Sequence, residues 1–161
     1  MDELVELSES QQRQYIDAES VFTALEQAVA EAQAVRGAMF WRNQSGRRYL
    51  IRESAGGAQK SLGPDTPENR EIHDRFADRK NVSQSRLQSL KAALKEQQRL
   101  NRALRVGRVP NVVVDTLNAL AAAGLREHFL TVGTHALYAY ETAAGVRVQS
   151  AATATRDIDL L

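Results

Sequence analysis

One stretch, residues 129–161, constrains the fold more than any other part of the 161-residue sequence. It reads as a short apolar strand, a Gly133-Thr134 turn, a helix, and a second strand that carries Asp157 and Asp159. Because the side chains of a strand alternate between its two faces, these two carboxylates project from the same face. Two carboxylates side by side repel each other, so the pair favours a cation between them.

The same stretch favours a bound phosphate beside that cation. Hard divalent ions such as Mg²⁺ are held by one or two carboxylates together with substrate phosphates. Gly133 lets the backbone approach a ligand closely, and the helix that follows offers unpaired N–H groups to an anion. A metal ion on one strand and a phosphate at the start of the neighbouring helix are the arrangement expected of a nucleotide-binding site.

Two runs of residues carry a family resemblance: 132–141, Val-Gly-Thr-His-Ala-Leu-Tyr-Ala-Tyr-Glu, and 155–161, Thr-Arg-Asp-Ile-Asp-Leu-Leu. They resemble the signature of the polymerase-beta-like nucleotidyltransferase-fold superfamily, which is a Gly-Gly or Gly-Ser turn followed by a strand with Asp-x-Asp. Thr134 stands where that signature usually has Gly or Ser, and it keeps the hydroxyl. The pattern is similar to that of one bacterial branch with a long N-terminal helical extension.

The resemblance implies both the site and the reaction. Gly133 and Thr134 would bind the triphosphate, and Asp157 and Asp159 would be the catalytic ligands of Mg²⁺ or Mn²⁺. The implied function is metal-dependent transfer of a nucleotide from a nucleoside triphosphate to an unknown acceptor. The superfamily takes a third carboxylate from a later strand, so we expect this sequence to be the N-terminal part of a longer protein. The chain alone should then bind Mg²⁺-nucleotide weakly and transfer nothing.

A long helix is predicted in the first part of the chain, over residues 8–36, because no Gly or Pro interrupts that stretch. Its apolar residues recur at spacings of three and four, which is the pattern of an amphipathic helix. They are Tyr15, Ala18, Phe22, Leu25, Val29 and Ala32. The register lasts only about three heptads, which favours a core helix over a coiled-coil partner.

The next segment predicts a β-hairpin near 38–53, with aromatic and branched residues on both sides of the turn residues 43–46. Trp41, Tyr49 and Arg52 would form either a stacking surface for nucleic acid or half-buried cross-strand pairs. Residues 54–63 contain several Gly and Ser residues, and we expect them to form a loop.

Two helices are expected to follow this loop. Residues 65–68, Asp-Thr-Pro-Glu, are typical of a helix start, and that helix should run to about residue 79. Residues 81–83, Asn-Val-Ser, are expected to interrupt it, with a second helix continuing to Leu104. Residues 105–110 contain Gly and Pro and predict a linker.

Residues 111–124 predict a helix that is apolar on all sides and should therefore be buried. A helix, a strand, a second helix and a second strand then follow one another as in an α/β domain. We therefore expect an α+β chain in two parts. Residues 1–108 would form a helical extension with a hairpin, and residues 109–161 the N-terminal part of a nucleotidyltransferase domain.

The net charge of +1 conceals an asymmetry along the chain. Residues 2–31 are mostly acidic, whereas basic residues dominate the stretch from Arg70 to Arg108. The two stretches could pair with each other or cover separate faces, or the basic helix could track a phosphate backbone. The chain would then be a nucleic-acid-binding module, or a non-catalytic helical module that forms homo-oligomers or docks a partner.

Composition excludes several other classes. The sequence has no cysteine, so disulfides and thiolate metal sites are excluded. No stretch approaches the roughly 18 consecutive apolar residues that a membrane helix requires, so no membrane partner is expected. The first residues are acidic and lack the order of a secretion signal, and a cytoplasmic location is the simplest interpretation.

Overall fold

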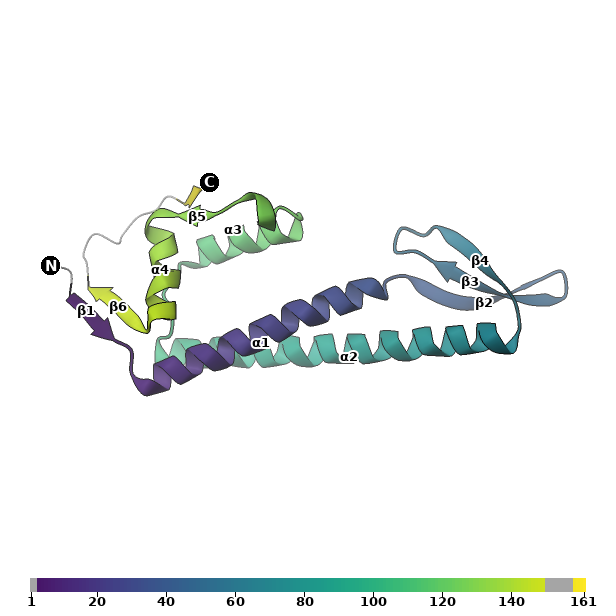
Figure 1. The fold of residues 1–161 in the computed structure, drawn as a ribbon, viewed down its shortest axis with the longest axis horizontal. Coiled ribbons are helices and arrows are strands. Elements are labelled where there is room, and N and C mark those ends of the chain that lie inside the picture. The colour runs from purple at the N-terminus through teal and green to yellow at the C-terminus, as the bar shows by residue number, and fades with distance from the viewer. Residues whose placement is uncertain (1–2, 150–157) are drawn as a thin grey trace. The chain divides into compact units, whose positions relative to one another are not determined.

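A computed structural model describes residues 3–149 and 158–161 of the chain. The fold is α+β, as the sequence predicts. Its elements in order are β1 (Glu3–Glu6), α1 (Glu9–Ala34), β2 (Ala38–Gln44), β3 (Arg47–Glu53), β4 (Gln59–Pro64), α2 (Pro67–Leu104), α3 (Asn111–Ala122), the short 3₁₀ helix η1 (Arg126–His128), β5 (Thr131–Val132), α4 (Gly133–Ala144), β6 (Val146–Gln149) and β7 (Asp159–Leu160) (Figure 1).

The chain divides into two compact units, and the boundary between them crosses both long helices. One unit, here called the sheet unit, consists of residues 20–96. The other, called the terminal unit, combines residues 1–19 with residues 97–161. Each unit is described by itself below.

The predicted hairpin forms the first two strands of the sheet unit. β2 and β3 pair antiparallel from Ala38↔Glu53 to Gln44↔Arg47. Ser45 and Gly46 connect them with φ angles of 51° and 75°. Positive φ at both central residues is the geometry of the two-residue turn whose twist matches that of the strands.

The expectation of a loop over residues 54–63 is wrong for its second half. β4 pairs antiparallel with β3, so the sheet has three strands in the order β2-β3-β4. Its sequence, Gln-Lys-Ser-Leu-Gly-Pro, shows no regular alternation, and pairing with β3 rather than local preference makes it a strand. Leu50 and Ile51 of the central strand are buried and form the core of this sheet.

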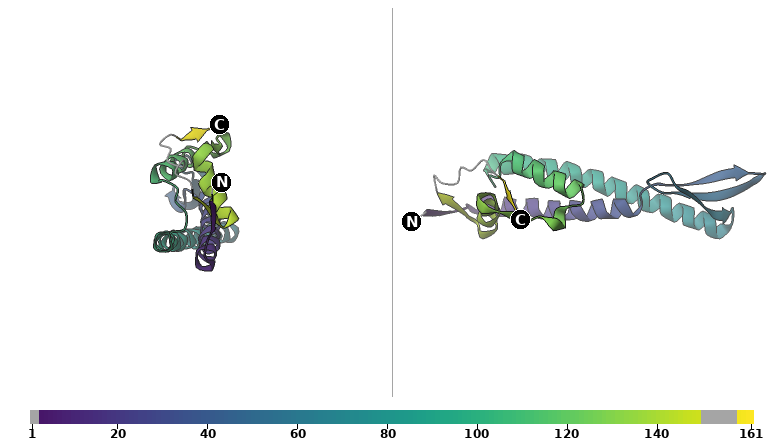
Figure 2. Two further views of the ribbon diagram at one scale, coloured as in Figure 1. Left: turned by 90° about the vertical axis from the view of Figure 1, so that its left-hand side faces the viewer. Right: turned by 90° about the horizontal axis from the view of Figure 1, so that it is seen from above.

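Residues 67–104 form one continuous helix, so the expected interruption at 81–83 is wrong. Asn81 and Ser83 have only slightly lower helix propensity than the residues around them, and tertiary packing overrides so small a difference. In the sheet unit the second half of α1 lies alongside α2 (Figures 1 and 2). Arg86 of α2 joins Glu31 of α1 at 2.9 Å.

The face that α1 buries differs from the predicted one. Ala28 is fully buried in the sheet unit, whereas Phe22 and Val29 are 46% and 38% exposed. Within this part of α1, the half-buried apolar residues Val21, Leu25 and Ala32 recur with the buried Ala28 at spacings of four, three and four, and Ala24 and Glu26 beside them are also half-buried. Such a stripe is typical of a coiled-coil seam rather than of the core helix that the sequence suggested.

The sheet contacts the first turns of α2 through ring and guanidinium packing. The ring of Trp41 lies 5.9 Å from that of His73, and the Arg52 guanidinium lies 4.6 Å from the centre of the Phe76 ring. Trp41 and Tyr49 are half-buried. These contacts agree with packed hairpin pairs, the second of the two alternatives for these aromatic residues.

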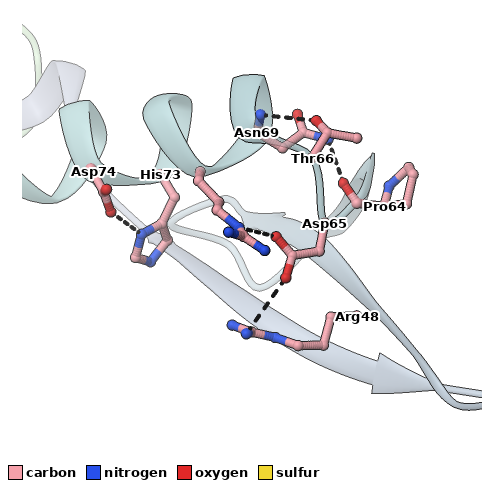
Figure 3. A network of polar contacts seen from close by, with 8 residues as sticks. Arg48, Pro64, Asp65, Thr66, Asn69, His73 and Asp74 are labelled. Carbon is pink, nitrogen blue, oxygen red and sulfur yellow. Dashed lines mark hydrogen bonds and ion pairs between the residues drawn. The ribbon is translucent and has the colours of Figure 1, made fainter.

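Polar contacts fix the start of α2 against the sheet (Figure 3). Asp65 accepts a hydrogen bond from Arg70 Nε at 2.6 Å and lies 3.5 Å from Arg48 Nη1. The Thr66 hydroxyl accepts from the Asn69 N–H, and the Asn69 amide donates to the Pro64 carbonyl. The Arg70 hydrogen bond, with the charges of both arginines, holds the pKa of Asp65 below its usual value.

The terminal unit contains two small antiparallel ladders. β1 pairs with β6 from Glu3↔Gln149 to Glu6↔Val146, and β5 pairs with β7. The start of the chain therefore forms a strand. Its partner lies more than a hundred residues later in the chain, and no local pattern can reveal such a pairing.

The helix α3 ends before Gly124, as predicted, but it is not enclosed. Val113 is buried, whereas Val112, Val114 and Leu117 are 58%, 43% and 39% exposed. The expectation of a fully buried helix is therefore wrong, because the described elements of the terminal unit cover only one side of α3. No described helix is long and apolar enough to cross a membrane.

Candidate nucleotide-binding site

The predicted strand, glycine turn and helix all form in the terminal unit. β5 ends at Val132, and α4 begins at Gly133 (Figure 1). Gly133 has a φ angle of 69°, which side chains with a Cβ rarely adopt. A glycine is therefore needed here for the sharp change of direction from strand to helix.

The ladder between β5 and β7 brings the two halves of the predicted site together. Thr131 pairs with Leu160, and Val132 pairs with Asp159. The backbones of Leu130 and Leu161 extend the ladder with hydrogen bonds of 2.7 and 2.9 Å. The backbone of Asp159 therefore lies directly beside the residue that precedes Gly133.

The second predicted carboxylate lies outside the described residues. Asp157 belongs to residues 150–157, and of Asp159 the structure describes the backbone only. Among the residues whose side chains are described, no group of three His, Asp or Glu residues could hold a metal ion. The metal ligands predicted from the sequence thus stay a prediction, supported by the register of Asp159.

The start of α4 offers backbone hydrogen-bond donors. The N-cap position is Val132, in an extended conformation, and within residues 3–149 and 158–161 no side-chain hydrogen bond caps the helix there. The first N–H groups of a helix have no partner within the helix, and they carry the positive end of its dipole. Gly133 is exposed and Thr134 is half-buried, so this end of the helix is accessible to an anion.

The third residue of α4, His135, is buried although its polar atoms have no described partner. Only 5% of the residue is exposed, and neither ring nitrogen has a hydrogen-bond partner. Its ring lies 5.9 Å from the ring of Tyr138, at an angle of 48°. This ring contact indicates that His135 packs locally within α4.

A buried ion pair holds the other end of α4, and no local sequence pattern indicates it. Glu141 is 4% exposed and accepts two hydrogen bonds from Arg108, one of them from Nε at 2.9 Å. Arg108 also donates to the Val148 carbonyl and lies over the Tyr138 ring, 5.1 Å from its centre. The Val148 N–H completes the group by donating to Glu141 at 2.9 Å.

This network ties the linker, α4 and β6 together. Burial of the Glu141 carboxylate favours its protonated form, but the hydrogen bonds from Arg108 and the Val148 N–H outweigh that effect. The pKa of Glu141 is therefore lower than its ordinary value. Glu141 is a structural anion of the terminal unit, and it is not available as a metal ligand while Arg108 holds it.

The basic stretch 70–108 is partly committed to contacts within each unit. The cations of this stretch that have protein partners include Arg70 with Asp65, Arg75 with Glu71, Lys80 with the Gly37 carbonyl, Arg86 with Glu31, and Arg108 with Glu141. Among these contacts, the one between Arg86 and Glu31 joins the basic stretch to the acidic residues 2–31. Binding of nucleic acid by this stretch stays a prediction.

Comparison with known proteins points to the same part of the chain. Residues 111–161 match a family model described as nucleotidyltransferase. No curated protein and no solved structure matches the chain. The match covers α3, η1, β5, α4, β6 and β7 and leaves out the long helices and the three-stranded sheet. The C-terminal third of the chain is thus similar to a nucleotidyltransferase-type domain, in agreement with the resemblance seen in the sequence.

Proposed function

We propose that the segment 111–161 binds a nucleoside triphosphate with a divalent metal ion and takes part in nucleotidyl transfer. The observation that carries this proposal is the register Val132↔Asp159, because it sets an acidic residue beside an uncapped helix start. A carboxylate and a helix N-terminus at one place suit a metal–triphosphate complex, which has both a cation and an anion.

The residues have separate roles in the proposed reaction. Asp157 and Asp159 supply hard oxygen donors, which fit Mg²⁺ or Mn²⁺. The N–H groups at Gly133 and Thr134 and the Thr134 hydroxyl hold the phosphates that leave. A divalent ion bound there supplies charge neutralisation at the phosphates and activation of the acceptor hydroxyl.

The rest of the terminal unit positions these groups. Arg108 and Glu141 anchor the far end of α4, so the first turn of the helix keeps its orientation relative to β5. His135 is buried in the first turn of the helix, and its ring lies 5.9 Å from that of Tyr138. Hydrogen-bond donors that are already in position stabilise the charge that develops in the transition state. They do not have to reorganise during the reaction.

Calorimetric titration of the 161-residue chain with each common nucleoside triphosphate, with and without Mg²⁺, tests the proposal. We expect binding that requires Mg²⁺, that is lost in Asp157→Asn/Asp159→Asn, and that weakens about tenfold in Thr134→Val. Asp115→Asn, an exposed acid on α3, is the matched control and should bind as the wild type does. Binding that persists in the double variant would exclude the proposed site.

A further inference from the structure

The two faces of the β2-β3-β4 sheet have different surroundings. Successive side chains of a strand point to opposite faces, and residues directly opposite each other in an antiparallel pair share a face. Trp41 and Arg52 lie on the face that packs against α2, where they contact His73 and Phe76. By the same register Tyr49 lies on the opposite face, which is here called the far face.

The register also assigns the neighbours of Tyr49 on the far face. Arg42 of β2 pairs directly with Tyr49, and Phe40 pairs with Ile51. Arg47, two residues before Tyr49 in β3, belongs to the same face. The far face therefore combines two aromatic rings and two arginines.

The burial of Ile51 shows how the middle of the far face is covered. Ile51 is only 5% exposed, although it lies on the face opposite α2. Arg42 of β2 donates a hydrogen bond to Gln59 of β4, on the other side of the central strand. Because Arg42 lies opposite Tyr49 and Gln59 lies opposite Glu53, this hydrogen bond crosses β3 over Ile51. A cationic group of the same chain thus covers the apolar centre of this face.

The far face presents a flat cation beside an aromatic ring. The Arg42 guanidinium lies 5.5 Å from the centre of the Phe40 ring, and its acceptor Gln59 is neutral, so the positive charge is retained. Tyr49, directly across from Arg42, is half-buried, so part of its side chain is accessible. Arg47 is exposed and adds a second charge.

The charge of the sheet favours an anionic partner. Residues 38–64 contain five basic residues and a single acidic one, Glu53. The Glu53 carboxylate accepts a hydrogen bond from the Gln59 amide, at the end of the far face away from Arg47. A polyanion can therefore contact Arg42 and Arg47 without meeting a carboxylate beside them.

The flat groups of the far face select among anionic partners. Unstacked bases of a single strand stack on aromatic rings and on guanidinium planes, while the phosphates contact arginine. A duplex keeps the faces of its bases inside the helix. An acidic peptide matches the charge of this face but has no planar groups that stack on Tyr49 and Arg42.

We infer that the far face of the sheet binds single-stranded nucleic acid. Neighbouring bases stack on the ring of Tyr49 and on the guanidinium of Arg42, and Arg47 contacts a phosphate. This inference does not depend on the proposed nucleotidyl transfer, which concerns the terminal unit.

Fluorescence anisotropy of labelled oligothymidylate and oligouridylate, each of about ten nucleotides, measures binding by the 161-residue chain. We expect binding that weakens as salt rises. Tyr49→Leu should weaken it about tenfold, because one stacked base loses its ring. Tyr49→Phe keeps the ring and should bind as the wild type does. Circular dichroism checks that both variants keep the fold.

A matched pair of arginine variants tests which surface contacts the phosphates. Arg47 and Arg79 are both exposed residues of the sheet unit, but Arg79 lies on α2 within the basic stretch 70–108. Arg47→Gln should reduce the slope of log affinity against log salt by about 0.7, as expected for one lost phosphate contact. Arg79→Gln should leave both the affinity and the slope unchanged.

The inference is overturned if the wild type binds neither oligonucleotide at low salt. It is also overturned if a folded Tyr49→Leu variant binds as tightly as Tyr49→Phe, because the ring then takes no part. Equal losses in Arg47→Gln and Arg79→Gln would assign the phosphate contacts to the basic helix instead. A polyglutamate peptide that competes as well as the unlabelled oligonucleotide would show that this face recognises charge alone.

Discussion

Asp159 lies opposite Val132 in the β5–β7 ladder, so its backbone is next to the residue that opens α4. Residues that are 27 positions apart in sequence thus meet at one strand-to-helix turn. The relationship matters because the N-terminus of α4 has no side-chain cap. In the proposed function, Asp159 would contribute to metal binding and the first N–H groups of α4 would hold the phosphate.

The left-handed conformation of Gly133 predicts a specific cost of substitution. Gly133→Ala should lower the free energy of unfolding by about 1–2 kcal/mol, because a Cβ is unfavourable at a φ angle of 69°. Urea denaturation measures the effect. Gly56→Ala is the control, since Gly56 has no heavy atom closer than 3.9 Å to an added Cβ and should tolerate the change. Equal stability of the two variants would contradict the observed turn.

The buried Arg108–Glu141 pair predicts a loss of stability that depends on pH. Glu141→Gln should destabilise the terminal unit by roughly 2 kcal/mol at pH 7, at the lower end for buried pairs because Arg108 remains partly exposed. The pKa of Glu141 is lower in the folded chain than in the unfolded one. The stabilisation by the Glu141 carboxylate is therefore complete at pH values above its pKa in the unfolded chain. This stabilisation is lost as the pH falls through its pKa in the folded chain.

Unfolding free energies of wild type and Glu141→Gln, compared between pH 7 and pH 3, measure this contribution. The difference between the two proteins should shrink as the medium becomes acidic. Glu127→Gln, which changes an exposed acidic residue on η1, is the matched control. Its free energy of unfolding should equal that of the wild type at both pH 7 and pH 3. A difference that is constant with pH would show that the carboxylate charge does not stabilise the fold.

The buried imidazole of His135 predicts an unusual response to an apolar substitution. His135→Phe removes two buried nitrogens that have no hydrogen-bond partner in the described part of the chain, so stability should stay equal or rise by about 1 kcal/mol. Thermal unfolding followed by circular dichroism is sufficient to measure it. A loss of more than about 2 kcal/mol would mean that the ring makes a hydrogen bond in solution, for example to a bound water.

Because α2 is continuous, it predicts whether a substitution of Ser83 raises or lowers the stability of the chain. Within an uninterrupted helix, Ser83→Ala should raise stability by about 0.5 kcal/mol, because alanine is the better helix former. If a new helix began at Ser83, the same substitution would remove its N-cap and lower stability by about 1 kcal/mol. Chemical denaturation distinguishes the two results by sign alone.

Local patterns were sufficient to predict the elements that depend on local chemistry. The extent of α1, the β2–β3 hairpin with its turn at Ser45-Gly46, and the passage from β5 through Gly133 into α4 were all predicted correctly. Each of them rests on helical spacing or on turn residues within a few positions. The prediction that Gly133 and Thr134 bind phosphate depends on the same local pattern and stays a prediction.

What the sequence could not reveal depends on contacts between distant residues. The strand β4 exists because β3 pairs with it, and β1 exists because β6 does. Arg108 was counted as one more charge of a basic stretch, and only the fold brings it to Glu141, 33 residues later. Phe22 was assigned to the buried face because spacing alone does not say which of two adjacent stripes another helix covers.

Electron paramagnetic resonance of Mn²⁺, titrated into the 161-residue chain with a nucleoside triphosphate, tests whether Asp157 and Asp159 hold a metal ion beside α4. Protein-bound Mn²⁺ loses its six-line solution signal, so the bound fraction is counted directly. The account predicts stoichiometric binding in the wild type and in Asp115→Asn, and loss of binding in Asp159→Asn. Equal Mn²⁺ binding by wild type and Asp159→Asn would contradict it.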